Sequence, residues 1–132
     1  MFNVMDVATK TVISTRPEAA IYDAIRIMAN RNIICLPVVD ADLNMVGVPS
    51  EKDVLRLLYE TRDRADQTVA DYMSTKVVSL DANANLIDLC DCLVDSTFRS
   101  VPITEDGKLC AIASRSDLIR GILRVKHQAL RR

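Results

Sequence analysis

Two short segments of the sequence combine a serine with an aspartate three residues later. The first pair is Ser50 with Asp53, and the second is Ser114 with Asp117. A serine hydroxyl and the free N–H groups of a helix N-terminus can donate to a phosphate, because the helix dipole makes that end partly positive. An aspartate one turn further on is an acceptor-only group that can take both hydroxyls of a ribose. Each pair therefore has the groups needed to hold a nucleotide.

A purely structural function explains the same spacing. Serine followed three residues later by an acidic residue resembles a capping box, which satisfies helix N–H groups without any ligand. Lys52 and Arg115 favour the ligand hypothesis, since a cation in the first helical turn opposes the helix dipole unless an anion compensates it. The residues alone leave both interpretations open.

Other kinds of site lack the residues they need. Three glycines are too few for a phosphate loop or a dinucleotide fingerprint. His127 is the only histidine, so no Ser-His-Asp or Cys-His catalytic unit is evident, and we expect no catalysis. Cys90 and Cys92 do not have the C-x-x-C spacing of a zinc site, and we expect small buried thiols and no metal. The 17 Lys and Arg against 18 Asp and Glu also argue against a general nucleic-acid binder, because such proteins usually have a clear basic excess.

The sequence also indicates the cellular compartment of the protein. No apolar run approaches the ~18 residues that a membrane-spanning helix needs. Asp6 and Lys10 interrupt the region in which a signal peptide would need an unbroken apolar core. We therefore expect a cytoplasmic protein with no membrane span.

The sequence repeats itself with a shift of 65 residues, which becomes 64 beyond the turn that follows residue 40. The matched pairs include Asp6/Asp71, Asp23/Asp88, Pro37/Pro102, Ser50/Ser114 and Asp53/Asp117. A copy of about 60 residues buries little apolar surface by itself. We therefore expect two repeats, 1–62 and 63–132, that share one core and are joined by the polar segment 61–68.

Each copy has the same order of hydrophobic periodicities, β-α-β-β-α, which predicts an α+β fold. The expected elements are strands at 12–15 and 77–80, helices at 21–28 and 86–93, strands at 33–39 and 98–104, strands at 45–48 and 108–113, and helices that begin at Ser50 and Ser114. Asp106 and Gly107 predict a hairpin turn between the last two strands of the second copy. A proline within the 33–39 and 98–104 strands restricts that point to a sheet edge or a strand start.

The order of these motifs resembles the CBS domain, which is named after cystathionine β-synthase. The family pattern apolar-x-x-apolar-Pro occurs at 33–37 and at 98–102, and each occurrence is followed by apolar-x-Ser-x-x-Asp. The segment 69–74 looks like the usual start of such a repeat. The resemblance covers residues 4–125 and implies a tandem pair of repeats with pseudo-twofold symmetry, a Bateman module. Such modules commonly bind adenosine-containing ligands and commonly pair into dimers.

The resemblance further implies two clefts, each mixing residues of both repeats. The first-choice cleft would be lined by Val77, Val78, Arg99, Val101, Ser50 and Asp53, and the second by Val12, Ile13, Ile34, Leu36, Ser114 and Asp117. This sequence departs from the family pattern at two positions. Ala111 stands where glycine is usual, and Pro49 lies inside the first Ser/Asp motif. We expect the Ala111 methyl group to crowd the second cleft. Arg99 has the neutral Ile34 as its counterpart, so we expect a phosphate to favour the first cleft.

These observations predict a non-catalytic regulatory module that binds an adenine nucleotide and modulates an unidentified partner protein. The expected ligand is AMP, ATP, NAD or S-adenosylmethionine. The alternative is a dimerisation scaffold whose clefts stay empty. We expect a homodimer, because the apolar helix faces cannot all turn inward in a chain of this size.

The last helix of the sequence is basic. Its cations are Arg120, Arg124, Lys126, Arg131 and Arg132. Cations near a helix C-terminus complement the helix dipole, whereas the absence of interleaved aromatic residues gives little support to nucleic-acid binding. Contact with a partner protein is the other interpretation.

Overall fold

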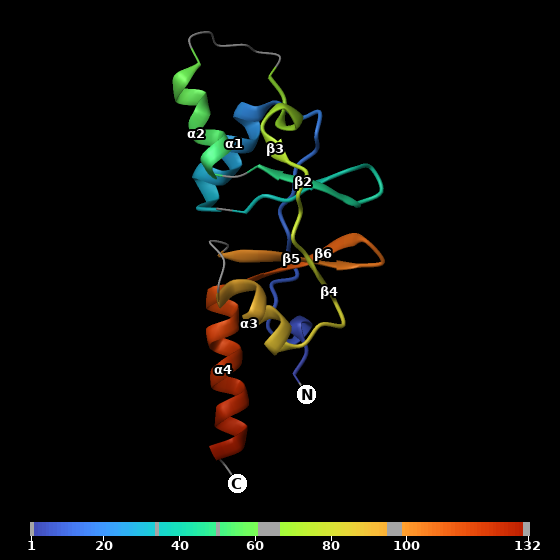
Figure 1. Ribbon diagram of the computed structural model, residues 1–132, viewed down its shortest axis with the longest axis vertical. Coiled ribbons are helices and arrows are strands. Elements are labelled where there is room, and N and C mark those ends of the chain that lie inside the picture. The colour runs from blue at the N-terminus through green and yellow to red at the C-terminus, as the bar shows by residue number, and fades with distance from the viewer. Residues whose placement is uncertain (1, 34, 50, 61–66, 95–98, 131–132) are drawn as a thin grey trace. The chain divides into compact units, whose positions relative to one another are not determined.

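The computed structural model describes residues 2–33, 35–49, 51–60, 67–94 and 99–130 (Figure 1). The helices are α1 (Ile21–Arg31), α2 (Glu51–Leu55), α3 (Leu86–Val94) and α4 (Arg115–Leu130), with 3-10 turns η1 (Val4–Asp6), η2 (Arg56–Tyr59) and η3 (Val69–Asp71). The strands are β1 (Val38–Val39), β2 (Met45–Pro49), β3 (Met73–Ser74), β4 (Leu80–Asp81), β5 (Ser100–Glu105) and β6 (Lys108–Ser114). The described strands form two sheets, ordered β1-β2-β3 and β4-β5-β6. The predicted α+β class is confirmed.

The chain divides into two compact units that are not continuous repeats. One unit, here called the continuous unit, is Ile13–Val77, and the other, the split unit, joins Met1–Val12 to Val78–Arg132. The division follows from backbone hydrogen bonds at the start of each repeat. Val4 donates to the Ala84 carbonyl at 2.8 Å in the split unit, while Val69 donates to the Ala19 carbonyl at 2.9 Å in the continuous unit. Each repeat therefore lends its opening segment to the unit that holds the rest of the other repeat.

Each unit has a hydrophobic core of its own, and each core contains residues of both repeats, so the repeats share two cores where one was expected. The split-unit core contains Val4, Ala82, Leu89, Leu93, Val101, Ile103, Ala111 and Ala113. The core of the continuous unit contains Ile21, Ala24, Leu36, Val38, Val69 and Tyr72. Val4 belongs to the first repeat and Val69 to the second. One repeat alone buries too little apolar surface for a stable core. In each unit, the opening segment of the other repeat supplies the additional apolar surface.

The hydrophobic periodicity located the longer elements correctly. The helices expected at 21–28 and 86–93 are α1 and α3, and the strands expected at 45–48 and 108–113 are β2 and β6. Asp106 and Gly107 both have positive φ, 53° and 79°, which fits the two-residue hairpin turn that this dipeptide predicts. The short strands are less regular. Of the 12–15 segment only Thr15 pairs, in a parallel bridge with Val38.

The predicted restriction on proline holds at Pro37 and fails at Pro102. Pro37 directly precedes β1, whereas Pro102 lies inside β5, the central strand of its sheet. Pro102 is opposite Ile112, whose carbonyl accepts a hydrogen bond from the Thr9 N–H on the other side of β6 at 2.8 Å. The Ile112 carbonyl therefore needs no N–H donor at position 102. Pro102 also precedes Ile103, the residue at which pairing with β4 begins, so its missing N–H faces the end of that short strand.

Gly47 is required by the close approach of β3. A Cβ atom at Gly47 would lie 2.6 Å from the Met73 sulfur and 2.9 Å from the Ser74 carbonyl oxygen. In the split unit the matching residue is Ala111, whose methyl group is fully buried in the core. The expected crowding of the second cleft by this methyl group stays a prediction, because that cleft takes residues from both units. The residue matching Met73 is the small Ala8, which also packs on that core.

We expect Gly47→Ala to lower the free energy of unfolding by about 1–3 kcal/mol, because the added methyl group overpacks the β2-β3 contact. In a Met73→Ala background the same substitution should cost less, since the sulfur atom is gone and only the Ser74 carbonyl remains close. Urea unfolding of the four proteins of this double-mutant cycle measures the coupling. Equal costs of Gly47→Ala in the two backgrounds would contradict the assignment of Met73 as the obstacle.

Candidate functional site

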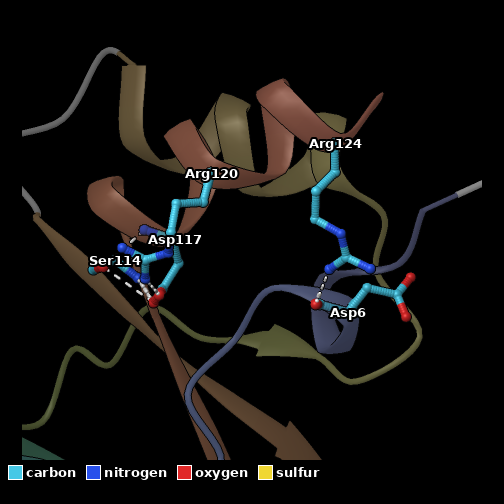
Figure 2. A network of polar contacts seen from close by, with 5 residues as sticks. All are labelled: Asp6, Ser114, Asp117, Arg120 and Arg124. Atoms are coloured by element: carbon cyan, nitrogen blue, oxygen red, sulfur yellow. Dashed lines mark hydrogen bonds and ion pairs between the residues drawn. The ribbon is translucent and has the colours of Figure 1, made fainter. Parts of the chain in front are cut away.

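Ser114 and Asp117 form a complete capping box at the start of α4 (Figure 2). The Ser114 N–H and hydroxyl donate to Asp117 Oδ2 at 2.8 and 3.0 Å, and the Asp117 N–H donates back to Ser114 Oγ at 3.1 Å. The Asp117 side chain is nearly buried, at 4% exposed, and its Oδ1 pairs with Arg120. The capping interpretation is thus confirmed for this pair. The carboxylate retains lone pairs beyond those used, so the cap and a ribose are compatible.

Arg115 has an intramolecular partner that explains its place in the first turn of α4. Its Nη2 donates to the carbonyl of Leu93 at 3.0 Å, near the C-terminal end of α3, where the helix dipole is negative. The presence of Arg115 in the first turn is therefore not by itself a sign of an anionic ligand. Lys52, the cation in the first turn of α2, is exposed.

Asp53 lies on α2 and is paired with Arg56, as Asp117 is with Arg120. Arg56 Nη2 is 3.5 Å from Asp53 Oδ1. The Arg56 guanidinium also lies over the ring of Tyr72, at 5.7 Å from the ring centroid. Ser50, the predicted partner of Asp53, lies outside the described residues. Neither predicted cleft includes Arg56 or Arg120, although their shared position three residues after the aspartate is a signal for this pairing.

The other predicted cleft residues differ in how accessible they are. Leu36 and Val101 are fully buried in the cores of their units. Val12, Ile13 and Val77 are half-buried, Val78 is exposed, and Ile34 lies outside the described residues.

Arg99 has an exposed side chain and a fixed backbone. Its carbonyl accepts a hydrogen bond from the Arg115 N–H at 3.0 Å, beside the start of α4. Within the described part of the chain, no ion pair holds its guanidinium. Because each predicted cleft takes residues from both units, and the structure describes each unit by itself, the meeting of these residues stays a prediction.

Two cations of α4 make contacts within the split unit. Arg120 binds Asp117, and Arg124 donates to the backbone carbonyl of Asp6 at 2.6 Å (Figure 2). Arg124 also lies over the Phe2 ring, at 5.4 Å from the centroid. The basic character of this helix is thus partly explained by contacts that hold the N-terminal segment. Arg131 and Arg132 lie outside the described residues.

The cysteines are reduced and half-buried rather than fully buried. Burial raises the pKa of the Cys35 thiol to about 11, and burial likewise raises the pKa of Cys92 and of Cys110. A thiol with a raised pKa is a poor nucleophile at neutral pH. Among the described residues, no three His, Cys, Asp or Glu side chains gather as a metal site would require. In the same part of the chain, no helix has both the length and the apolar character to cross a membrane.

Several known proteins that resemble this chain contain CBS domains. The family model of the CBS domain matches residues 4–60 and 69–124. An uncharacterised 17.7 kDa protein of Acidianus ambivalens is 32% identical over 123 residues, which are 92% of this chain and 74% of that protein. The CBS domain-containing protein YhcV of Bacillus subtilis is 29% identical over 89% of this chain and 84% of its own length.

Among solved structures, CBSX2 in complex with AMP matches with a TM-score of 0.82 and 27% identity, over 96% of this chain and 99% of that one. CBSX2 is a CBS-pair protein of Arabidopsis thaliana. This chain spans only 59% of the full CBSX2 sequence. A CBS domain pair solved with 5′-methylthioadenosine and S-adenosylmethionine matches with a TM-score of 0.76 and 21% identity, which bears on the fold alone.

Proposed function

The chain belongs to the CBS domain family and contains two such domains in tandem, and from this premise we propose that it is a non-catalytic regulatory module that binds AMP or a related adenine nucleotide. Binding would bias the interaction of the module with a partner protein. The two repeats of this module are the segments 1–62 and 63–132.

One observation supports AMP most directly. The CBSX2 structure, which shares the fold over 96% of this chain at 27% identity, holds AMP. The chain itself supplies an aspartate at the same place of both repeats, Asp53 and Asp117, each with an arginine three residues later. A repeated carboxylate of this kind suits the two hydroxyls of a ribose, because both are donors and the carboxylate is an acceptor only.

In the proposed complex, different residues of the first cleft bind the ribose, the adenine and the phosphate of the nucleotide. Asp53 accepts from the ribose hydroxyls, and apolar groups of the strand segments at Val77 and Val78 contact the adenine. Arg99, which is exposed and cationic, receives the phosphate. The second cleft, around Ser114 and Asp117, offers the same ribose acceptor with a neutral residue in place of Arg99. We therefore propose that the first cleft is the tighter site for phosphorylated ligands.

A dimerisation scaffold with empty clefts is the second candidate function. The complete capping box of Ser114 and Asp117 favours it, because that pair has a structural function without a ligand. Both candidates include a homodimer, which we propose on the ground of the exposed apolar side chains of α3 and α4.

Titration calorimetry with AMP, ATP, NAD and S-adenosylmethionine tests the proposal. We expect AMP to bind, and we expect Asp53→Asn to weaken AMP by about tenfold, the effect of one lost hydrogen bond to a charged group. Asp117 supports a helix cap, so the melting temperature of each aspartate variant is measured beside its affinity. Absence of binding by all four ligands would support the scaffold function instead.

A further inference from the structure

In the continuous unit, the Arg56 guanidinium lies between a candidate ligand group and a buried aromatic ring. Its Nη2 is 3.5 Å from Asp53 Oδ1, and its Cζ is 5.7 Å from the Tyr72 ring centroid. The Arg56 side chain is 59% exposed, so without the ring it would sample many rotamers. Attraction between a guanidinium and an aromatic face restricts that freedom. The ring therefore helps to fix the arginine, and the arginine helps to fix the carboxylate.

Tyr72 is itself held by the opening segment of the second repeat. This segment, 67–73, is called the docked segment below. The Tyr72 hydroxyl accepts from Gln67 Nε2 at 2.7 Å, and both side chains are buried. The docked segment is joined to the rest of the unit by hydrogen bonds from Ile21 N–H to the Gln67 carbonyl, at 3.0 Å, and from Val69 N–H to the Ala19 carbonyl, at 2.9 Å. The ring over Arg56 is thus in place only when the segment is docked.

Docking of this segment has an energetic cost as well as these gains. Gln67 Oε1 is buried without a hydrogen-bond partner in the described part of the chain. A buried acceptor that loses its hydrogen bonds to water and gains none destabilises the docked state. This cost weakens docking, and a ligand that binds more tightly to the docked state would offset it.

The split unit lacks the equivalent connection. Arg120 pairs with Asp117 at the same spacing, but the residue that matches Tyr72 is Val7, which has no ring. Among the described residues, Arg120 makes no contact with an aromatic ring. The two carboxylates therefore differ: only Asp53 is linked through an arginine to the opening segment of the other repeat.

We propose that Arg56 and Tyr72 position the Asp53 carboxylate for ribose, and that they couple nucleotide binding at Asp53 to docking of segment 67–73. This inference rests on the proposed function. Coupling is reciprocal: if docking strengthens nucleotide binding, nucleotide binding stabilises docking to the same extent. Arg56 is a positioning residue in this scheme, because it acts on the ligand through Asp53. Nucleotide binding at Asp53 in the first repeat would in this way stabilise the docked position of the first residues of the second repeat.

Hydrogen exchange of the docked segment with and without AMP measures the coupling. The amides of Val69 and Ala70 are the reporters, since they donate to the carbonyls of Ala19 and Pro17. We expect AMP to slow their exchange by about fivefold or more. Arg56→Gln should abolish this slowing, because it removes the charge between the ring and the carboxylate. Arg120→Gln is the matched control, and it should leave the slowing intact.

Tyr72→Phe separates the ring from the hydroxyl. It keeps the aromatic face and removes the hydrogen bond to Gln67. We expect faster exchange in the absence of ligand, with the slowing by AMP preserved. If Tyr72→Phe loses the slowing while it still binds AMP, the ring contact is not the connection and the proposal is overturned.

Preference for ribose over deoxyribose reports the positioning directly. We expect the wild type to bind AMP about tenfold more tightly than 2′-deoxyadenosine monophosphate, and Arg56→Gln to lose most of this preference with little change in Tm. Retention of both the preference and the slowing by Arg56→Gln would overturn the proposal. Binding of AMP by calorimetry without slower exchange at 67–73 would overturn the coupling and leave the proposed function standing. Absence of AMP binding to the wild type would overturn both.

Discussion

Arg99→Ala is expected to weaken AMP binding by about tenfold or more and to leave adenosine binding almost unchanged. A hydrogen bond between arginine and a phosphate contributes about 1.5–3 kcal/mol, and each 1.4 kcal/mol is about a factor of ten in affinity. Arg99 is exposed and directly precedes β5, and the hydrogen bond from Arg115 to its carbonyl fixes its backbone. Because adenosine lacks the phosphate, loss of the guanidinium should lower the affinity for AMP and leave the affinity for adenosine almost unchanged.

Calorimetric titration of both ligands into both proteins measures this difference. Repeating the AMP titration at several salt concentrations should give a flatter dependence for Arg99→Ala, because salt screens the contact that the substitution removes. Arg26→Ala is a suitable control, since Arg26 is an exposed arginine of α1 that pairs with Asp23 on the same helix. Equal losses for AMP and adenosine would show that Arg99 acts through packing and not on the phosphate.

The sequence was sufficient to predict the longer helices and strands because their patterns are local. The apolar spacing of Ile21 and Ala24 marks the buried face of α1 whatever that helix packs against. The exchange of opening segments was not predictable in this way. Both segments start with the same capping arrangement, Asn3 with Asp6 and Thr68 with Asp71, so neither sequence identifies the unit on which it docks.

The candidate site shows the same division between local and tertiary signals. The capping box of Ser114 and Asp117 follows from three-residue spacing, and the sequence identified it as one of two interpretations. The contact of Arg115 with the Leu93 carbonyl joins residues 22 positions apart, and it depends on how α4 packs against α3. The ring contact of Arg56 with Tyr72 likewise exists only because segment 67–73 docks on the continuous unit. No local pattern records such contacts.

The split unit leaves an apolar groove uncovered along α3 and α4. Its volume is about 380 Å³, and its lining is Phe2, Leu86, Ile87, Cys90, Leu118, Ile122, Val125 and Lys126. Large apolar side chains of the two helices stay exposed, namely Ile87 at 65%, Ile119 at 61%, Ile122 at 49% and Leu123 at 68%. Contiguous apolar surface of this kind is typical of an interface, and homodimers with twofold symmetry are the commonest assemblies. This is the surface that the proposed homodimer would bury.

Ile122→Asp is expected to convert that dimer into a monomer. A carboxylate placed in an apolar interface loses its hydration without gaining a partner, so the dimer should dissociate on the order of 100-fold more readily. Sedimentation at micromolar concentration should give about twice the chain mass of 14.7 kDa for the wild type and the chain mass for Ile122→Asp.

Leu43→Asp is the matched control. Leu43 is an equally exposed apolar residue in the turn before β2, where its positive φ of 68° suits aspartate better than leucine. A dimer should persist in this control, because the turn lies outside the groove. A monomeric wild type would contradict the proposed dimer, and an Ile122→Asp protein that stays dimeric would exclude the α3 and α4 surface as its interface.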